Sequence, residues 1–383
     1  MSDLSRTPRI DGLIVALTPR ERLLQIFSFD QPDRPFRWEC IAYWQQTLNR
    51  WRREGLVGHP DKLFEMDPQI SFLTFHSVFP IHTGFTRNPY LPPFETIVVE
   101  EGPGWRIVRG SDGILRREVK DGSSMPQWLK FPVENREDYE EIKERLDPDD
   151  PERFPDEWEE KAASYTERDI PISMPLCGFY GHLRNLFGTK RVPYFMYREP
   201  AFVRDILKYW TWFNEKVLTR VAEHLDLDYL LIWEDMCGRS GPLISPQLFE
   251  RYIYPCYRSL CSHAHRLGIK NVCVDTDGNT YTLIPLFMKA GINGMIPFEV
   301  QAGNDIVRIR EMYPRLVIMG GLDKLALTRG KADIDRELDT KVSWVLEMGG
   351  FIPSLDHAAP PDIPFENFCY YMKRIREIEA RFS

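Results

Sequence analysis

The chain has 383 residues, of which 43% are hydrophobic and 13% aromatic, so it can bury a large core. Lys and Arg number 49 against 57 Asp and Glu, and this acidic balance without a long basic run argues against a nucleic-acid partner. The seven cysteines include no C-x-x-C pair, which favours a reducing compartment. Residues 1–25 lack an apolar signal core, and no stretch reaches the roughly 18 apolar residues of a membrane span. We therefore expect a cytoplasmic protein without a membrane partner.

The N-terminal part predicts two helices. Thr18 directly before Pro19 is typical of a helix start, so a helix is expected over 18–28. A short apolar run over 35–43 follows and predicts a first strand. Residues 43–56 then carry aromatic and apolar side chains at helical spacing, and a glycine ends this second helix.

Residues 94–120 have a different character. Short β-branched runs are separated by Gly-Pro-Gly and Ser-Asp-Gly turns, which predicts a small inserted antiparallel β meander. Residues 131–168 are dominated by Asp, Glu, Pro and Lys. That composition indicates exposed helices and connections on a solvated face.

From about residue 170 onward, short apolar runs alternate with helical patterns. Strands are expected at 172–179, 228–234, 270–275, 292–299, 315–323 and 349–357. Helices are expected between them at 246–268, 282–291, 305–313 and 333–349. This alternation is typical of parallel βαβ units. Together with the length, it predicts an α/β fold, a (β/α)8 TIM barrel with an N-terminal helical elaboration, in one domain over 1–383.

Ionisable side chains end each of the last five predicted strands. They are Glu234 with Asp235, Asp275 with Asp277, Glu299, Asp323 with Lys324, and Asp356 with His357. Because the carboxyl ends of all strands in a parallel barrel open on one face, these groups are expected to share the pocket where barrel active sites lie. The alternative for any one of them is a helix cap or a turn.

The motif VDTDGN places two carboxylates two residues apart where a strand becomes a loop. Asp275 and Asp277 could both reach a hard cation or a water above the barrel. The alternative is an Asx-turn made by Asp277 and Gly278, with Asp275 alone in the pocket.

His357 follows an apolar strand and precedes a proline pair. An imidazole at the pocket mouth could bind a metal or transfer a proton near neutral pH, because its unperturbed pKa is about 6.5. The alternative is a histidine that makes structural hydrogen bonds only. Asp356 beside it and its position at the strand end favour the functional interpretation.

Two further candidates lie earlier in the chain. Glu39 ends the first predicted strand among Trp38, Tyr43 and Trp44, and rings near a pocket favour a planar or apolar substrate. A packed aromatic core explains the same residues equally well. Arg184 lies in a predicted loop after a strand and could contact an anionic substrate, with surface or helix-cap use as the alternative.

Four stretches of the second half resemble the uroporphyrinogen decarboxylase superfamily. They are LCGFYGHLRNLFG, IWEDMCGRSGPLISPQLFERYIYPCY, the run from VDTDGN to LIPLFMKAGINGMIPFEV, and GGLDK followed by GGFIPSLDHAAPPDIPFEN. The resemblance implies a TIM-barrel enzyme that acts as a decarboxylase or a methyltransferase. It also implies a homodimer.

The sequence departs from both branches of that superfamily. True decarboxylases carry an arginine-rich N-terminal signature that binds the substrate's carboxylates, whereas the corresponding FRWECIAYWQQ keeps only Arg37. His357 aligns with their late histidine. The methyltransferase branch uses a zinc site with an H-x-C motif where this chain has Asp275-Thr276-Asp277. Replacing thiolate by carboxylate still permits zinc but favours oxygen-preferring ions.

The leading hypothesis is a metal-dependent methyltransferase that moves a methyl group from an O-methyl or N-methyl donor to a corrinoid protein. The expected cofactor is a divalent metal such as zinc, together with the corrinoid of the partner protein. The expected metal ligands, which are also the expected catalytic residues, are Glu234, Asp275, Asp277 and His357. The expected substrate contacts are Glu39, Arg184, Asp235, Glu299, Asp323 and Lys324. One alternative is a decarboxylase of a small carboxylic acid or a uroporphyrinogen-like substrate, with Asp275 or Asp277 and His357 moving protons. Another is a non-catalytic ligand-binding barrel.

Overall fold

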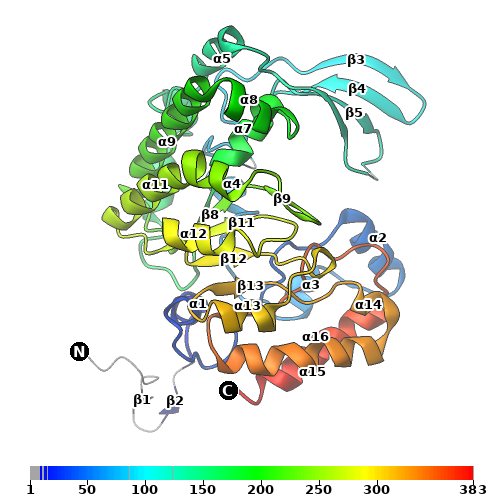
Figure 1. Cartoon of the computed structure of the whole chain (residues 1–383). Coiled ribbons are helices and arrows are strands. Elements are labelled where there is room, and N and C mark those ends of the chain that lie inside the picture. Colours follow the sequence, from blue (N-terminus) through cyan, green and yellow to red (C-terminus); the bar gives the residue numbers. More distant parts are fainter. Residues whose placement is uncertain (1–8, 11–12, 15, 86, 123, 383) are drawn as a thin grey trace.

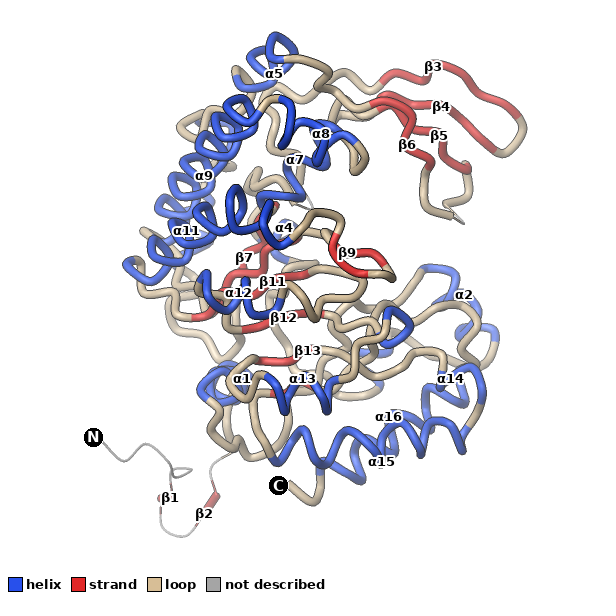
Figure 2. The backbone as a smooth tube through the Cα atoms, viewed as in Figure 1, coloured by secondary structure: helices blue, strands red, loops and turns tan. Residues whose placement is uncertain are grey.

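A computed structural model describes the chain except for residues 1–8, 11–12, 15, 86, 123 and 383. Its largest sheet has six parallel strands in the order β14-β13-β12-β11-β8-β7. They are β7 (Ser173–Cys177), β8 (Tyr229–Trp233), β11 (Asn271–Asp275), β12 (Gly294–Ile296), β13 (Val317–Met319) and β14 (Phe351–Ile352). Each lies inside a strand predicted from the sequence, which confirms the mixed α/β fold with a parallel sheet (Figure 2).

Two further segments adjoin the edges of this sheet. Ile70 pairs with Ile172 beside β7, and Tyr43 pairs with Ala359 beyond β14, each through a single parallel bridge. The amide of Asp67 donates to the carbonyl of Arg37 at 2.8 Å, which links the two segments. The strand predicted over 35–43 is therefore a loop. It adjoins the sheet through the bridge at Tyr43 but contains a turn and is not a regular strand.

The inner side of the sheet holds a core of its own. Alternating residues such as Leu231, Cys273 and Val317 pack together there. Phe36 and Phe72 from the two adjoining segments belong to the same cluster, as does Leu23 from the first helix. Since successive residues of a strand point to opposite faces, the other set packs against the outer helices.

Helices surround the sheet (Figure 1). They are α1 (Pro19–Ser28), α2 (Gln45–Arg53), α3 (Pro60–Leu63), α4 (Phe75–Val78), α5 (Arg136–Lys143), η1 (Pro151–Arg153), α6 (Trp158–Ala163), α7 (Phe179–Phe187), α8 (Arg191–Arg198), α9 (Pro200–Ala222), α10 (Pro246–Leu248), η2 (Phe249–Ile253), α11 (Tyr254–Arg266), α12 (Ile284–Ala290), η3 (Val300–Ala302), α13 (Ile306–Met312), α14 (Ala326–Arg329), α15 (Lys331–Glu347) and α16 (Phe365–Glu379). Thr18 caps α1, as predicted, and the structure adds a reciprocal bond with Glu21 that was not predicted. In the described part of the chain, none of the helices has the length and apolar character needed to cross a membrane.

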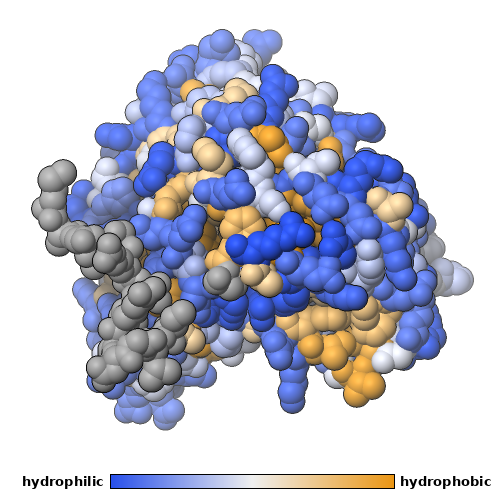
Figure 3. Space-filling model, turned by 90° about the horizontal axis from the view of Figure 1, so that it is seen from below, coloured by the Kyte–Doolittle hydropathy of each residue, from blue (hydrophilic) through white to orange (hydrophobic). Residues whose placement is uncertain are grey.

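An antiparallel sheet projects from this body (Figure 1). It consists of β3 (Ile97–Gly102), β4 (Trp105–Arg109), β5 (Leu115–Val119) and β6 (Gln127–Lys130). The first three are the predicted meander over 94–120, whereas β6 lies beyond it and was not predicted. Short pairs also form between β1 (Arg9–Ile10) and β2 (Leu13–Ile14), and between β9 (Cys237–Gly238) and β10 (Gly241–Pro242). Seen from below, the molecule is mainly hydrophilic, with an apolar area near one edge (Figure 3).

Candidate active site

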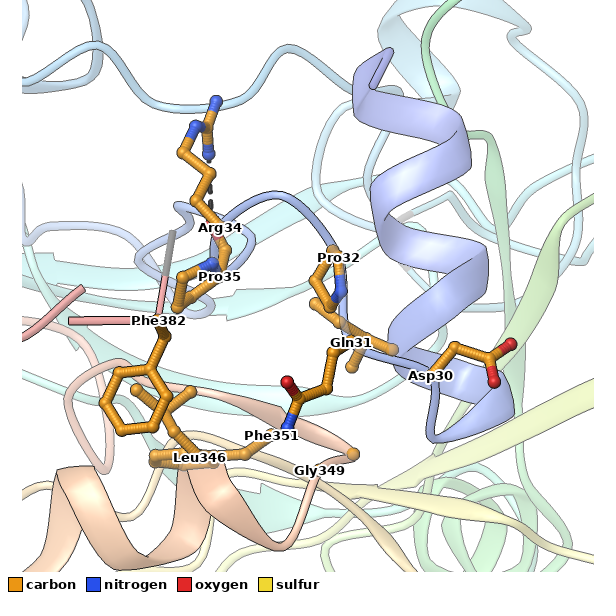
Figure 4. A pocket seen from close by; sticks show the side chains of 11 residues that line it. Asp30, Gln31, Pro32, Arg34, Pro35, Leu346, Gly349, Phe351 and Phe382 are labelled. Atoms are coloured by element: carbon orange, nitrogen blue, oxygen red, sulfur yellow. Dashed lines mark hydrogen bonds between the residues drawn. The ribbon is translucent and has the colours of Figure 1, made fainter. Parts of the chain in front are cut away.

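A cavity at the amino end of the sheet is too small to be the site. It lies between the turn after α1, with Asp30 and Pro32, and Gly349–Phe351 at the start of β14 (Figure 4). Its volume of about 30 Å³ accommodates water but no substrate. The side chains that could perform chemistry lie instead at the carboxyl end of the parallel strands.

Three side chains come together at the carboxyl end, and we call them the carboxylate–histidine cluster. Asp277 follows β11, Glu299 follows β12 and His357 follows β14. Each offers one ligand atom, and these atoms all lie within 4.8 Å of one another. Nε2 of His357 is 3.6 Å from Oδ2 of Asp277. All three are partly exposed, so a metal ion and a substrate could both reach them.

A glycine positions this cluster. The amide of Gly278 donates to Oε2 of Glu299 at 3.0 Å, which ties the loop after β11 to the loop after β12. Gly278 has a φ of +79°, and a Cβ there would lie 2.6 Å from the carbonyl group of Cys237. Only glycine therefore lets the β9–β10 hairpin pack this closely against the loop that carries Asp277.

Lys324 lies between Glu299 and the buried carboxylate of Asp356. Nζ of Lys324 lies 3.2 Å from Oδ1 of Asp356 and 3.7 Å from Oε1 of Glu299. Asp356 is fully buried and also accepts from the amides of Val300 and Lys324. Burial raises the pKa of Asp356, while Lys324 opposes that shift. Asp356 thus holds Lys324 where it can orient Glu299.

His357 is biased toward its charged form. Burial lowers the pKa of an imidazole, but here the hydrogen bond and the charge of Asp277 outweigh burial and hold the pKa of His357 above its usual value. The pair can therefore share a proton between Nε2 and Oδ2, or release it when both side chains bind a cation.

Asp275 faces the interior of the sheet. It lies beside Trp233 in register on the neighbouring strand and is only 7% exposed. Its side chain makes no hydrogen bond to the described residues. Burial, and then the charges of Asp235 and Asp277, raise its pKa well above the usual value. The surroundings of Asp275 thus favour its protonated form, and its carboxyl oxygens are not among the ligand atoms of the carboxylate–histidine cluster.

Arg184 and Asp235 form an ion pair at the same end. Nη1 of Arg184 is 2.9 Å from Oδ2 of Asp235, and its guanidinium lies 5.2 Å from the centre of the Trp233 ring. Burial and the charge of Asp277 raise the pKa of Asp235. The charge of Arg184 is already balanced, so a substrate anion would have to compete with Asp235 for it.

Glu234 lies apart from the cluster and anchors a helix. Its carboxylate accepts from the amides of Phe179 and Gly181, at 2.9 and 2.7 Å, and from the Tyr257 hydroxyl at 2.6 Å. These are the contacts of an N-terminal helix cap, and they occupy both oxygens. The structure therefore does not bring Glu234 to the other predicted metal ligands. Burial raises its pKa to about 7.

The same contacts explain why the predicted loop over 178–188 instead contains α7 (Phe179–Phe187). No side chain of the local sequence caps this helix, since its N-cap is Gly178. The free amides are bound by Glu234, more than fifty residues later in the chain. A Cβ on Gly178 would come within 2.3 Å of that carboxyl group. The prediction of a loop was wrong because the stabilising group is distant in sequence.

Two other predicted substrate contacts also make structural bonds. Glu39 is buried and accepts from the amide of Leu355 and the hydroxyl of Tyr371, and burial raises its pKa to about 7. Asp323 accepts from the amide of Leu325 and pairs with Arg329 at 3.0 Å. Neither side chain has its carboxylate in the cluster.

Sequence reasoning missed two features of the site. Glu299 is predicted as a substrate contact, yet the structure brings its carboxylate together with Asp277 and His357. Its position at a strand end was the available signal. The need for Gly278 was not predicted, although its place directly after Asp277 was visible. Conversely, Asp275 and Glu234 were expected as ligands and lie outside the cluster.

Comparisons with known proteins agree with this architecture. The family model described as uroporphyrinogen decarboxylase (URO-D) matches residues 118–378. Uroporphyrinogen decarboxylases from two strains of Thermus thermophilus are 23% identical over 233 residues, which is 56% of this chain and 62% of each relative. The match thus spans less than two thirds of those relatives. A solved methyltransferase from Methanosarcina mazei has a TM-score of 0.55 and 15% identity, covering 94% of this chain and 98% of its own, and so shares the fold.

Proposed function

Because the chain belongs to the uroporphyrinogen decarboxylase family, we propose that it is a metal-dependent methyltransferase of that family. It moves a methyl group from an O-methyl or N-methyl donor to a corrinoid carried by a partner protein. The carboxylate–histidine cluster at the strand ends is the observation that carries the proposal. The shared fold with a methyltransferase supports it.

The residues of the cluster fit a divalent metal ion. Two carboxylates and one imidazole are ligands that zinc accepts and that oxygen-preferring ions accept more readily than a thiolate site. Three protein ligands leave further positions open for a substrate. When bound, the metal supplies Lewis-acid polarisation of the donor's oxygen or nitrogen.

The chain's own residues perform the remaining tasks. Asp277, Glu299 and His357 hold the site, and Lys324 together with the Gly278 amide orients Glu299. Asp275, the neutral acid beside Trp233, gives its proton to the oxygen or nitrogen that keeps the electron pair when the bond to methyl breaks. Arg184 and Asp235 form an ion pair at the same end of the sheet.

The remaining features belong to the same proposal. The six parallel strands and the two adjoining segments occupy the eight strand positions of a (β/α)8 barrel in one domain, with the meander as an insertion. The shared inner core supports this arrangement. The enzyme works in the cytoplasm on a small molecule, as a homodimer.

Decarboxylation of a carboxylic acid is the second candidate. The names of the matching family and relatives favour it, as does Asp275, because a neutral acid can protonate the carbanion left after carbon dioxide departs. A uroporphyrinogen-like substrate would need cationic partners for its carboxylates. Arg37 is bound to Glu379 at 3.0 Å and to Glu65 at 3.7 Å, so it is already paired. A small acid fits this site better.

Metal content and methyl transfer test the proposal. The protein is purified without chelators, its metal is quantified, and methyl ethers and methylamines are offered with free cob(I)alamin as acceptor. We expect bound metal and formation of methylcobalamin, both lost in Asp277→Ala and kept in Asp362→Ala, an exposed control. A metal-free wild type with unchanged activity in Asp277→Ala contradicts the proposal. Carbon dioxide release without a corrinoid favours the decarboxylase, and binding without turnover of any compound favours a non-catalytic barrel.

A further inference from the structure

A second cavity lies between the base of the meander and the end of β7. Its volume is about 230 Å³, and its wall includes Phe85, Asn88, Ser111, Cys177, His182 and Asn185. We propose that it binds a small uncharged ring compound with a hydrogen-bonding substituent. This binding site does not depend on which reaction the carboxylate–histidine cluster performs.

His182 is a buried polar group without a partner. It is 2% exposed, its ring stacks on Trp210 with centroids 3.9 Å apart, and its Nε2 has no hydrogen-bond partner among the described residues. Burial lowers its pKa to about 3, so the ring is neutral. A buried polar atom left without a partner costs free energy, which a ligand in the cavity could recover once the ring shifts toward it, because Nε2 itself has almost no accessible surface. Stacking alone would be served better by phenylalanine.

The other polar groups of the wall are also uncharged or balanced. Asn185 lies one helical turn from His182 on α7, and its amide makes only a weak contact of 3.9 Å to the sulfur of Cys177. The single carboxylate, Asp112, is paired with Arg116 at 2.8 Å. A charged ligand would lose its hydration here without gaining a counter-charge. The cavity therefore favours a neutral molecule.

The size and the neighbours of the cavity indicate a ring. A volume of about 230 Å³ is just below the ~300–1,000 Å³ of typical small-molecule sites, which suits a single ring. Phe85 and Tyr90 offer flat apolar walls. The ring of Phe85 also lies 5.6 Å from that of Trp233, which borders Asp275 and Arg184. A ligand in the cavity is thus one aromatic side chain away from the strand ends.

Binding of benzamide, with benzoate as its charged counterpart, tests this inference. Ligand-observed NMR titration gives the affinities for the 383-residue chain and for two variants of it, His182→Phe and Asn185→Leu. His182→Phe keeps the stacking on Trp210, and Asn185→Leu keeps the volume. Asn49→Leu on the exposed side of α2 is the matched control. Thermal unfolding of every variant is recorded in parallel.

We expect benzamide to bind the wild type and the Asn49→Leu control equally, and benzoate to bind about tenfold more weakly because its charge is desolvated. Each cavity variant should weaken benzamide about tenfold, the usual cost of one lost hydrogen bond. His182→Phe should unfold at the same temperature as the wild type or higher. Equal benzamide binding in all four proteins, no benzamide binding at all, or tighter binding of benzoate overturns the inference.

Discussion

Four of the acids at the ends of the parallel strands fall into two groups with different surroundings. Glu234 and Asp323 accept hydrogen bonds from backbone amides, and Glu234 is completely buried. Asp277 keeps 35% of its side chain exposed, and Oε1 of Glu299 lies 3.7 Å from Nζ of Lys324. A strand end brings an acid to this face, but the nearby helix amides decide whether it stabilises the fold or remains available for chemistry.

Removing Glu234 should produce the largest effect. Glu234→Ala leaves two buried amides and the Tyr257 hydroxyl without an acceptor, so we expect a loss of about 4 kcal/mol in the free energy of unfolding. Urea denaturation measures it. Metal content per folded molecule should not change. A stable variant that has lost its metal would place Glu234 in the second group after all.

Removing a charge from the carboxylate–histidine cluster should lower the metal affinity and leave the free energy of unfolding nearly unchanged. Glu299→Gln keeps an acceptor for the Gly278 amide but weakens metal binding, by about 100-fold or ~2.7 kcal/mol if Glu299 is a ligand. Competition with a chelating dye measures the affinity. The free energy of unfolding of the metal-free protein should change by less than about 1 kcal/mol. Unaltered metal affinity would remove Glu299 from the cluster.

Glu39 is a buried acid that accepts a hydrogen bond from a backbone amide, as Glu234 does, and its pKa allows a test by pH. Its pKa is about 7 in the folded state against 4.5 as the ordinary value, so the folded state binds the extra proton between these values. Stability is therefore full at low pH and is lost as the pH rises through 7. Between pH 5 and 8 the wild type should lose about 2.5 kcal/mol relative to Glu39→Gln, which stays neutral.

Urea denaturation of both proteins at the two pH values gives the difference. Glu141→Gln on the surface of α5 serves as the control and should stay within about 0.5 kcal/mol of the wild type at each pH. A gap between the wild type and Glu39→Gln that does not grow with pH would mean that Glu39 is ionised despite its burial.

Lys324 connects the two groups, and its removal should have the smallest effect. Lys324→Met keeps the aliphatic part of the side chain but removes the contacts to Asp356 and Glu299. We expect metal affinity to fall about tenfold through the loss of orientation. The same dye competition measures it. A gain in affinity would indicate that the charge of Lys324 repels the metal more than its contacts help.

Most of the fold could be predicted because its signals are local. The strands of the second half and the cap of α1 follow from apolar runs and from neighbouring residues. What failed depends on distant groups. α7 is capped by Glu234 from the next strand, and residues 35–43 are held extended by single bridges and hydrogen bonds with later segments.

The site was predictable in its location but not in its membership. Glu234 and Asp277 look alike in the sequence, since both follow a strand of the same sheet. Their difference lies in whether a helix N-terminus from another segment donates to the carboxylate, as α7 does to Glu234 and none of the described helices does to Asp277. That information exists only once the chain has folded.

Strand β3 carries a practical consequence. Among the described strands it pairs with β4 alone, and Val98 and Val99 are 50% and 60% exposed. An open row of amides and carbonyls beside β-branched side chains invites a strand from a neighbouring molecule. Glu101 is paired with Lys120 at 2.9 Å, whereas Glu100 follows Val99 directly and supplies a charge that opposes such stacking. Replacing Glu100 by an uncharged residue should therefore make concentrated stocks precipitate through this arm while the α/β body stays intact.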